Sequence, residues 1–85
     1  MFYELQTRYD HHKSFYGKAN VIIEGNTKKL ISYNTHVASL ISGKLEVYGT
    51  YSATTLRHIK EFARQCGFGS LTKKEIERGF IKWEF

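Results

Sequence analysis

The sequence of 85 residues contains no proline and a single cysteine, Cys66. Without proline there is no proline-rich linker, so we expect one domain over residues 1–85. A small secreted domain normally carries an even set of disulfide-bonded cysteines, so one cysteine favours a reducing cytoplasm. No apolar run reaches the roughly 18 residues of a spanning helix, and residues 1–4 lack the features of a signal peptide. We therefore expect no membrane partner.

Negative charge is also scarce. Thirteen lysines and arginines stand against eight aspartates and glutamates, which gives a net charge of +5 and a pI near 9.4. This balance favours an anionic partner such as nucleic acid, a nucleotide or an acidic protein face. Many small domains are equally basic for solubility alone, so the net charge does not decide between an anionic partner and mere solubility.

The order of apolar and turn-forming residues predicts a sheet over the first half of the chain. Residues 2–9 alternate in polarity, and short β-branched runs follow between residues that favour tight turns. We expect turns at Gly25-Asn26, Asn34-Thr35 and Ser42-Gly43. The expected strands are 2–9, a second one that begins at Phe15 and Tyr16 and continues through 21–23, then 29–33, 36–41 and 44–50.

The pattern becomes helical after Ser52. Apolar residues then recur at helical spacing, which predicts a helix over about 53–66 with Ser52 as its N-cap and Gly67 beyond its C-terminus. Thr72 and Glu75 have the spacing of a capping box, so a short second helix should begin there and end at Gly79. The alternating tail, residues 80–85, predicts a last strand. The expected fold class is α+β: an antiparallel β-meander with one long and one short helix packed on one face.

Three possible catalytic sites have little support. Asp10-His11-His12 matches the name motif of the DHH phosphoesterases, but the further aspartates and histidines of a metal site are missing, so we expect no metal and no cofactor. A metal-independent ribonuclease would need only a base, an acid and a cation, which the histidines, Arg57 and Tyr16 could supply. Cys66 lies at a helix C-terminus, where the dipole disfavours a thiolate, and we read it as a small core residue.

Basic residues interleaved with aromatic ones are the stronger signal. Lys13, Tyr16 and Lys18 lie in one short window beside Gly17 and Phe15, and such residues contact phosphates and stack on bases. The alternative is a solvated loop beside core aromatics. The start of the long helix adds hydroxyls and a basic stripe, where a helix N-terminus favours anions. The candidates there are Thr54, Thr55, Arg57, His58 and Lys60, with Arg64 continuing the stripe and Glu61 placed to pair with Arg57.

Three blocks of sequence together resemble a family of small uncharacterised proteins of bacteriophages and bacterial mobile elements. The blocks are K-S-F-Y-G-K-A at 13–19, S-Y-x-T-x-V-A at 32–38, and S-x-T-T-x-R-H-x-K-E-F at 52–62. The resemblance implies a small accessory protein of such an element, and it implies no catalytic residue.

We expect a non-enzymatic protein that binds an anionic partner, foremost nucleic acid. The first alternative is a protein–protein inhibitor of a host defence enzyme, of the anti-CRISPR kind or acting by nucleotide sequestration. In that case the partner is an acidic host protein or a nucleotide. The second alternative is the metal-independent ribonuclease. The sequence is compatible with a homodimer.

Overall fold

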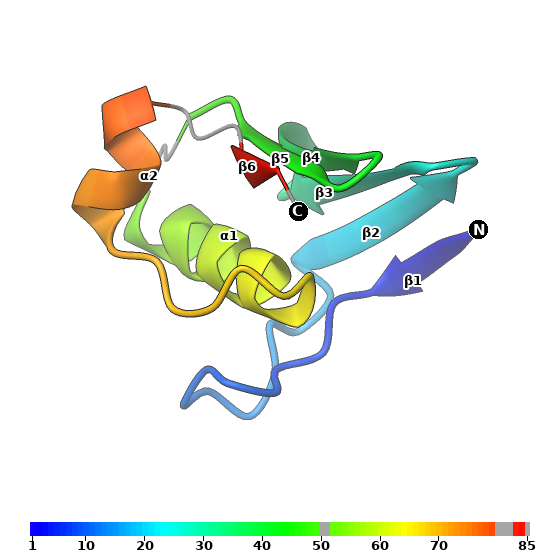
Figure 1. The fold of residues 1–85 in the computed structure, drawn as a ribbon. Coiled ribbons are helices and arrows are strands. Elements are labelled where there is room, and N and C mark those ends of the chain that lie inside the picture. The colour runs from blue at the N-terminus through cyan, green and yellow to red at the C-terminus, as the bar shows by residue number, and fades with distance from the viewer. Residues whose placement is uncertain (50–51, 80–82, 85) are drawn as a thin grey trace.

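The computed structural model describes residues 1–49, 52–79 and 83–84, and it contains a six-stranded antiparallel sheet whose strands lie in chain order (Figure 1). Two helices, one long and one short, lie on one face of this sheet, so the expected α+β meander is confirmed. The strands are β1 (Phe2–Glu4), β2 (Ala19–Glu24), β3 (Thr27–Ser32), β4 (Thr35–Ile41), β5 (Lys44–Val47) and β6 (Trp83–Glu84), and the helices are α1 (Ala53–Gln65) and α2 (Lys73–Gly79). None of the helices described has the length and apolar character needed to cross a membrane.

A row of buried cross-strand partners holds the helices on the sheet. Val21, Leu30, Ala38 and Val47 lie opposite one another on four neighbouring strands, and each is at most 1% exposed. Helix α1 adds buried residues such as Phe62 to the same core. Because removal of apolar surface from water is the main stabilising term, this row fixes which face of the sheet α1 covers.

Both helices have the expected caps. The Ser52 side chain accepts the N–H of Thr55, and at the other end the N–H of Phe68 donates to the Ala63 carbonyl beside Gly67, whose φ is +96°. This is a Schellman motif. In the second helix Thr72 and Glu75 exchange two hydrogen bonds of 2.9 and 3.2 Å, so the capping box is confirmed; the flanking Leu71 and Ile76 are buried.

Several predicted boundaries are wrong. The first strand ends at Glu4 instead of residue 9, and the second begins at Ala19 instead of Phe15, which leaves residues 5–18 as an irregular segment, the β1–β2 loop. The third error is a turn: Ser32 pairs with Thr35, so the reversal uses Tyr33 and Asn34, one residue earlier than expected. The other two turns lie where the sequence placed them.

The sequence could not show why the loop leaves the sheet. The backbone N–H groups of Arg8, Tyr9 and Asp10 donate to a carboxylate on α1, Glu61, and not to a strand. Phe15 is buried in the core, as the alternative reading expected. The predicted strand 44–50 is also too long, because β5 ends at Val47 and residues 48–49 are not in a strand. Residue 50 of that prediction and residues 80–82 and 85 of the predicted last strand lie outside the described residues, and 83–84 form β6.

Candidate functional site

Glu61 fixes the β1–β2 loop against α1. Its Oε1 accepts three backbone N–H groups, from Arg8, Tyr9 and Asp10, at 3.2, 2.9 and 2.9 Å, and its Oε2 accepts the side-chain amide of Gln65 at 2.6 Å. Glu61 is only 3% exposed, so these bonds replace the water that a carboxylate would otherwise bind. Glu61 therefore binds the loop and not Arg57, the partner that the sequence suggested. Its charge is used to hold the loop.

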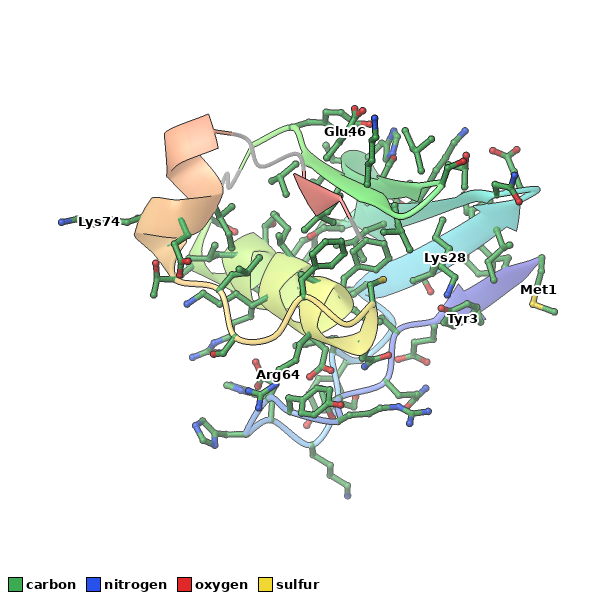
Figure 2. All side chains as sticks on the ribbon, in the orientation of Figure 1. Met1, Tyr3, Lys28, Glu46, Arg64 and Lys74 are labelled. Atoms are coloured by element: carbon green, nitrogen blue, oxygen red, sulfur yellow. The ribbon has the colours of Figure 1, made fainter. Side chains whose placement is uncertain are left out.

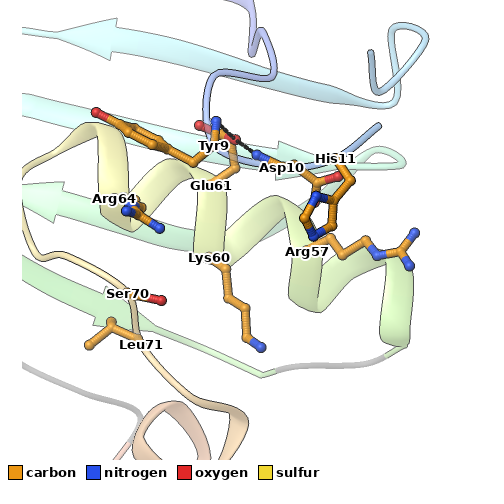
Figure 3. A pocket seen from close by; sticks show the side chains of 9 residues that line it. All are labelled: Tyr9, Asp10, His11, Arg57, Lys60, Glu61, Arg64, Ser70 and Leu71. Atoms are coloured by element: carbon orange, nitrogen blue, oxygen red, sulfur yellow. Dashed lines mark hydrogen bonds between the residues drawn. The ribbon is translucent and has the colours of Figure 1, made fainter. Parts of the chain in front are cut away.

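The fixed loop, α1 and the segment before α2 enclose a cavity of about 290 Å³, here called the basic groove (Figure 3). Arg57, Lys60 and Arg64 extend along one side of α1 and all three line it, which confirms that the predicted stripe lies on one surface. The guanidinium of Arg64 also lies 4.5 Å from the ring centre of Tyr9. Among the described residues, the lining is Tyr9, Asp10, His11, Arg57, Lys60, Glu61, Arg64, Ser70 and Leu71.

The two carboxylates in the basic groove are already engaged. Asp10 Oδ1 accepts the backbone N–H and the ring Nδ1–H of His12, both at 2.8 Å. Burial acts to raise the pKa of Asp10, but these two bonds and the nearby Arg57 outweigh it and lower the pKa. Hydrogen bonds from neutral donors leave the charges of Asp10 and Glu61 in place, but Arg57, Lys60 and Arg64 outnumber them, so the charge of the groove still favours an external anion.

A second cavity, of about 310 Å³, opens on the other side of Arg57 and is here called the tyrosine pocket. No aspartate or glutamate is among its lining residues. It combines two cations, Lys18 and Arg57, with the rings of Tyr16 and Tyr33 and the exposed Thr54 of the first turn of α1. Its lining is His12, Ser14, Phe15, Tyr16, Lys18, Tyr33, Thr54, Arg57 and His58.

Tyr16 and Tyr33 occupy equivalent positions in two neighbouring tight turns. Each has φ of +53° and is followed by a second residue of positive φ, Gly17 or Asn34. The turns are joined by a hydrogen bond of 2.9 Å from the Tyr33 N–H to the Lys18 carbonyl. Bulky residues avoid this backbone region, and such strained positions concentrate at functional sites. The rings are 71% and 49% exposed, so core packing does not explain their presence.

Arg57 connects the two cavities, because it lines both. Its Nη1 donates to Nε2 of His12 at 2.8 Å, and His12 Nδ1 is held by Asp10. Arginine has donors only, so in this contact Nε2 accepts and Nδ1 is the nitrogen that donates to Asp10. The chain Asp10–His12–Arg57 thus sets the direction of the guanidinium between the groove and the pocket.

The inner wall of the tyrosine pocket is formed by His58. Its side chain is 1% exposed, Nδ1 lies 2.8 Å from the Ser32 hydroxyl, and the rings of Phe15 and Tyr33 lie 4.5 and 5.7 Å away, centre to centre. Burial lowers the pKa of His58, an effect only partly opposed by Asp10, so the imidazole is neutral at pH 7. Thr55, 5% exposed, bonds to the same Ser32 hydroxyl.

Comparison with protein families places residues 3–78 in a family of unknown function, DUF8033. The chain belongs to this family. The match covers most of the chain and includes every residue that lines the two cavities. Neither the curated proteins nor the solved structures gave a match.

In this DUF8033 chain, the three sequence blocks noted above meet at the tyrosine pocket. The first supplies Ser14, Phe15, Tyr16 and Lys18, the second Tyr33, and the third Thr54, Arg57 and His58. Five predicted contact residues therefore come together there: Tyr16, Lys18, Thr54, Arg57 and His58.

The remaining predicted residues lie elsewhere. Lys60 lines the basic groove, whereas Lys13 is exposed and lines neither cavity. Thr55 and His58 need correction as surface contacts, because both are buried and only a ligand inside the pocket can approach His58. Sequence reasoning missed Tyr33, and it considered His12 only for a metal site or a ribonuclease. An aromatic residue in a tight turn, where glycine or asparagine is usual, was the available signal for Tyr33.

The DHH-like motif does not form a cluster. Asp10 and His12 bond to each other, and His11 lines the basic groove. Within residues 1–49, 52–79 and 83–84 no group of three or more His, Cys, Asp or Glu side chains is placed to hold a metal ion. Cys66 is half-buried against the core at the end of α1, and burial raises the pKa of its thiol.

Proposed function

We propose that this protein binds a single strand of nucleic acid across the exposed side of α1 and does not catalyse a reaction on it. The observation that carries the proposal is the position of Arg57, which joins a basic groove to a pocket with two exposed tyrosines. Proteins that bind single strands combine these two elements: a cationic track for phosphates and aromatic rings for bases.

The charges on this surface support the proposal. Lys60 and Arg64 lie along the groove and Lys18 lies at the pocket, while the two carboxylates of the groove accept hydrogen bonds from the protein itself. Each cation that meets a phosphate displaces condensed counterions, which favours binding at low salt. The resemblance of the three sequence blocks adds the setting: an accessory protein of a phage or mobile element, acting in the bacterial cytoplasm.

The test is fluorescence anisotropy with labelled single-stranded RNA, single-stranded DNA and the matching duplexes. We expect single strands to bind more tightly, because only unpaired bases can reach Tyr16 and Tyr33. Affinity should fall steeply with salt. Lys18→Ala should reduce the log–log salt slope by about 0.7, the value for one phosphate contact on a single strand.

Lys74→Ala is the matched control. Lys74 is an exposed lysine on α2 that points away from both cavities (Figure 2), and its loss removes the same charge. If both variants change the affinity and the salt slope equally, the binding is a general attraction between charges and not a contact at this site. Absence of binding to any nucleic acid at low salt would refute the proposal and favour an acidic host protein as the partner of the same surface.

A ribonuclease is the second candidate, and one specific observation favours it. Asp10 orients His12 as a general base would require, and Arg57 and Lys18 are near enough to line the same pocket. Against turnover, His12 Nε2, the atom that would take the proton, already accepts a bond from Arg57. Cleavage of RNA in EDTA that is lost in Asp10→Asn and His12→Ala would establish this candidate. Intact RNA after long incubation would exclude it.

A further inference from the structure

The hydrogen bonds behind the tyrosine pocket form a continuous chain from Ser52 to His58. The Ser52 hydroxyl donates to Thr55 Oγ1 at 3.3 Å, Thr55 Oγ1 lies 3.0 Å from Ser32 Oγ, and Ser32 Oγ lies 2.8 Å from His58 Nδ1. Each hydroxyl has one proton to give. Because Thr55 receives from Ser52, its own proton is available for Ser32, and the Ser32 proton is then available for Nδ1. This order makes Nδ1 an acceptor and places the proton of neutral His58 on Nε2.

His58 Nε2 is therefore a donor, and it has no hydrogen-bond partner in the part of the chain that the structure describes. A buried donor without an acceptor is costly, about 1–3 kcal/mol, and such atoms are uncommon in folded proteins. His58 belongs to the wall of the tyrosine pocket. An acceptor atom of a ligand in this pocket would satisfy Nε2.

The other groups around the pocket define the chemistry of such a ligand. Helix α1 has no acidic residue in its first turn, and of its first N–H groups those of Thr55 and Leu56 bond to Ser52. For Ala53 and Thr54 no N–H partner is found among the described residues. These donors, with Lys18 and Arg57, suit a phosphate, and the two exposed tyrosine rings suit a base.

The size of the pocket limits the ligand to one nucleotide. A volume of about 310 Å³ is at the lower end of the range for small-molecule sites, roughly 300–1,000 Å³. A longer segment of strand must continue outside the pocket, and the basic groove begins on the other side of Arg57.

From these observations we propose that the tyrosine pocket is a nucleoside-phosphate site. In this site the phosphate lies at the first turn of α1 between Lys18 and Arg57, the base lies against Tyr16 or Tyr33, and the Nε2–H of His58 donates to a ligand oxygen or ring nitrogen. This inference rests on the proposed function and names the unit that the pocket recognises. The nucleotide is either free or one unit of a bound strand.

Access to Nε2 requires a side chain to move, because the atom has almost no contact with solvent. Phe15 is 6% exposed and packed in the core, whereas Tyr33 is half exposed and lies over the His58 ring. Because Phe15 belongs to the core and Tyr33 is half exposed, Tyr33 is the side chain that moves in this proposal. A base that then stacks on Tyr33 restores the covering of His58.

The test is calorimetric titration of the whole chain with AMP, UMP, inorganic phosphate and a short single-stranded oligonucleotide. His58→Asn is the central variant, since the asparagine amide reaches the level of Nδ1 toward Ser32 but ends short of Nε2. His36→Asn is the control, because His36 lines neither cavity. We expect His58→Asn to weaken binding at least about tenfold, the size of a lost hydrogen bond to a charged group, and His36→Asn to leave it unchanged.

The ligands separate the outcomes. Loss of AMP or UMP binding in His58→Asn supports a site for free nucleotides, and loss with the oligonucleotide alone supports a site for one unit of a strand. An oligonucleotide that binds His58→Asn and the parent protein equally overturns the inference and leaves the proposed function standing. No binding of any probe overturns both. If inorganic phosphate binds as tightly as AMP and loses as much affinity in His58→Asn, the claim that the pocket recognises a nucleoside is overturned.

A second measurement covers a variant that fails to fold. The imidazole ¹H–¹⁵N correlations of the unmodified protein should show a proton on Nε2 of His58, with a shift when AMP or the oligonucleotide is added. A proton on Nδ1, or an Nε2–H signal that does not respond to a ligand that binds, would refute the assignment.

Discussion

Glu61→Ala tests whether one carboxylate holds the β1–β2 loop on α1. Three backbone N–H groups meet Glu61 Oε1 at 2.9–3.2 Å, and hydrogen bonds to charged groups contribute about 1.5–3 kcal/mol each. Arg8 and Tyr9 are exposed, so water can replace part of what their N–H groups lose. We therefore take about 1 kcal/mol for each bond, below that range, and expect the free energy of unfolding to fall by about 3 kcal/mol.

Such a loss is large for this chain. At about 0.05–0.15 kcal/mol per residue, a domain of 85 residues has roughly 4–13 kcal/mol of stability in all. Glu61→Gln keeps the shape and an acceptor oxygen but loses the charge. Because charge-assisted hydrogen bonds are about twice as strong as neutral ones, it should cost roughly half as much, about 1.5 kcal/mol.

The assay is urea denaturation together with amide hydrogen exchange. In the parent protein the amides of Arg8, Tyr9 and Asp10 should be protected although they lie outside any strand. Both variants should weaken that protection, and nucleic-acid binding should weaken with it, since the loop forms one wall of each cavity. Glu46→Gln, on β5 away from the loop (Figure 2), should change stability by less than about 0.5 kcal/mol. Unprotected loop amides in the parent, or an unchanged midpoint in Glu61→Gln, would refute the reasoning.

Three further predictions concern single residues. Thr72→Ala should lower the unfolding free energy by about 1 kcal/mol through loss of the N-cap, and an unchanged urea midpoint would mean that α2 adds nothing to stability. Because the pKa of His58 is lowered, the unfolded chain binds a proton below about pH 6.5 that the folded chain refuses. Stability should therefore fall as pH drops from that point, and His58→Asn should flatten the fall in urea midpoints measured across it. Tyr16→Asn replaces an exposed ring at positive φ with a residue that tolerates this backbone. The free energy of unfolding should therefore stay the same or rise by up to about 1 kcal/mol, while single-strand binding weakens. A clear loss of stability would mean that the ring supports the fold.

Local sequence alone predicted the elements whose signals are local. Gly25-Asn26 and Ser42-Gly43 encode their turns because glycine adopts positive φ without strain. Thr72 and Glu75 encode a helix start because the two residues satisfy each other's N–H groups. The class of fold followed from these signals and from the change to helical spacing after Ser52.

The tertiary structure decided where the first strand ends and what the site contains. Alternation over residues 2–9 looked like a strand, but Glu61, more than 50 positions away, takes the N–H groups that a neighbouring strand would need. The sequence also proposed His58 as a surface contact, whereas packing against Ser32 and Phe15 buries it and leaves Nε2 without a hydrogen-bond partner among the described residues. Propensity and spacing report on neighbours along the chain. Which carboxylate binds which backbone group, and which histidine nitrogen is left over, depends on residues that only folding brings together.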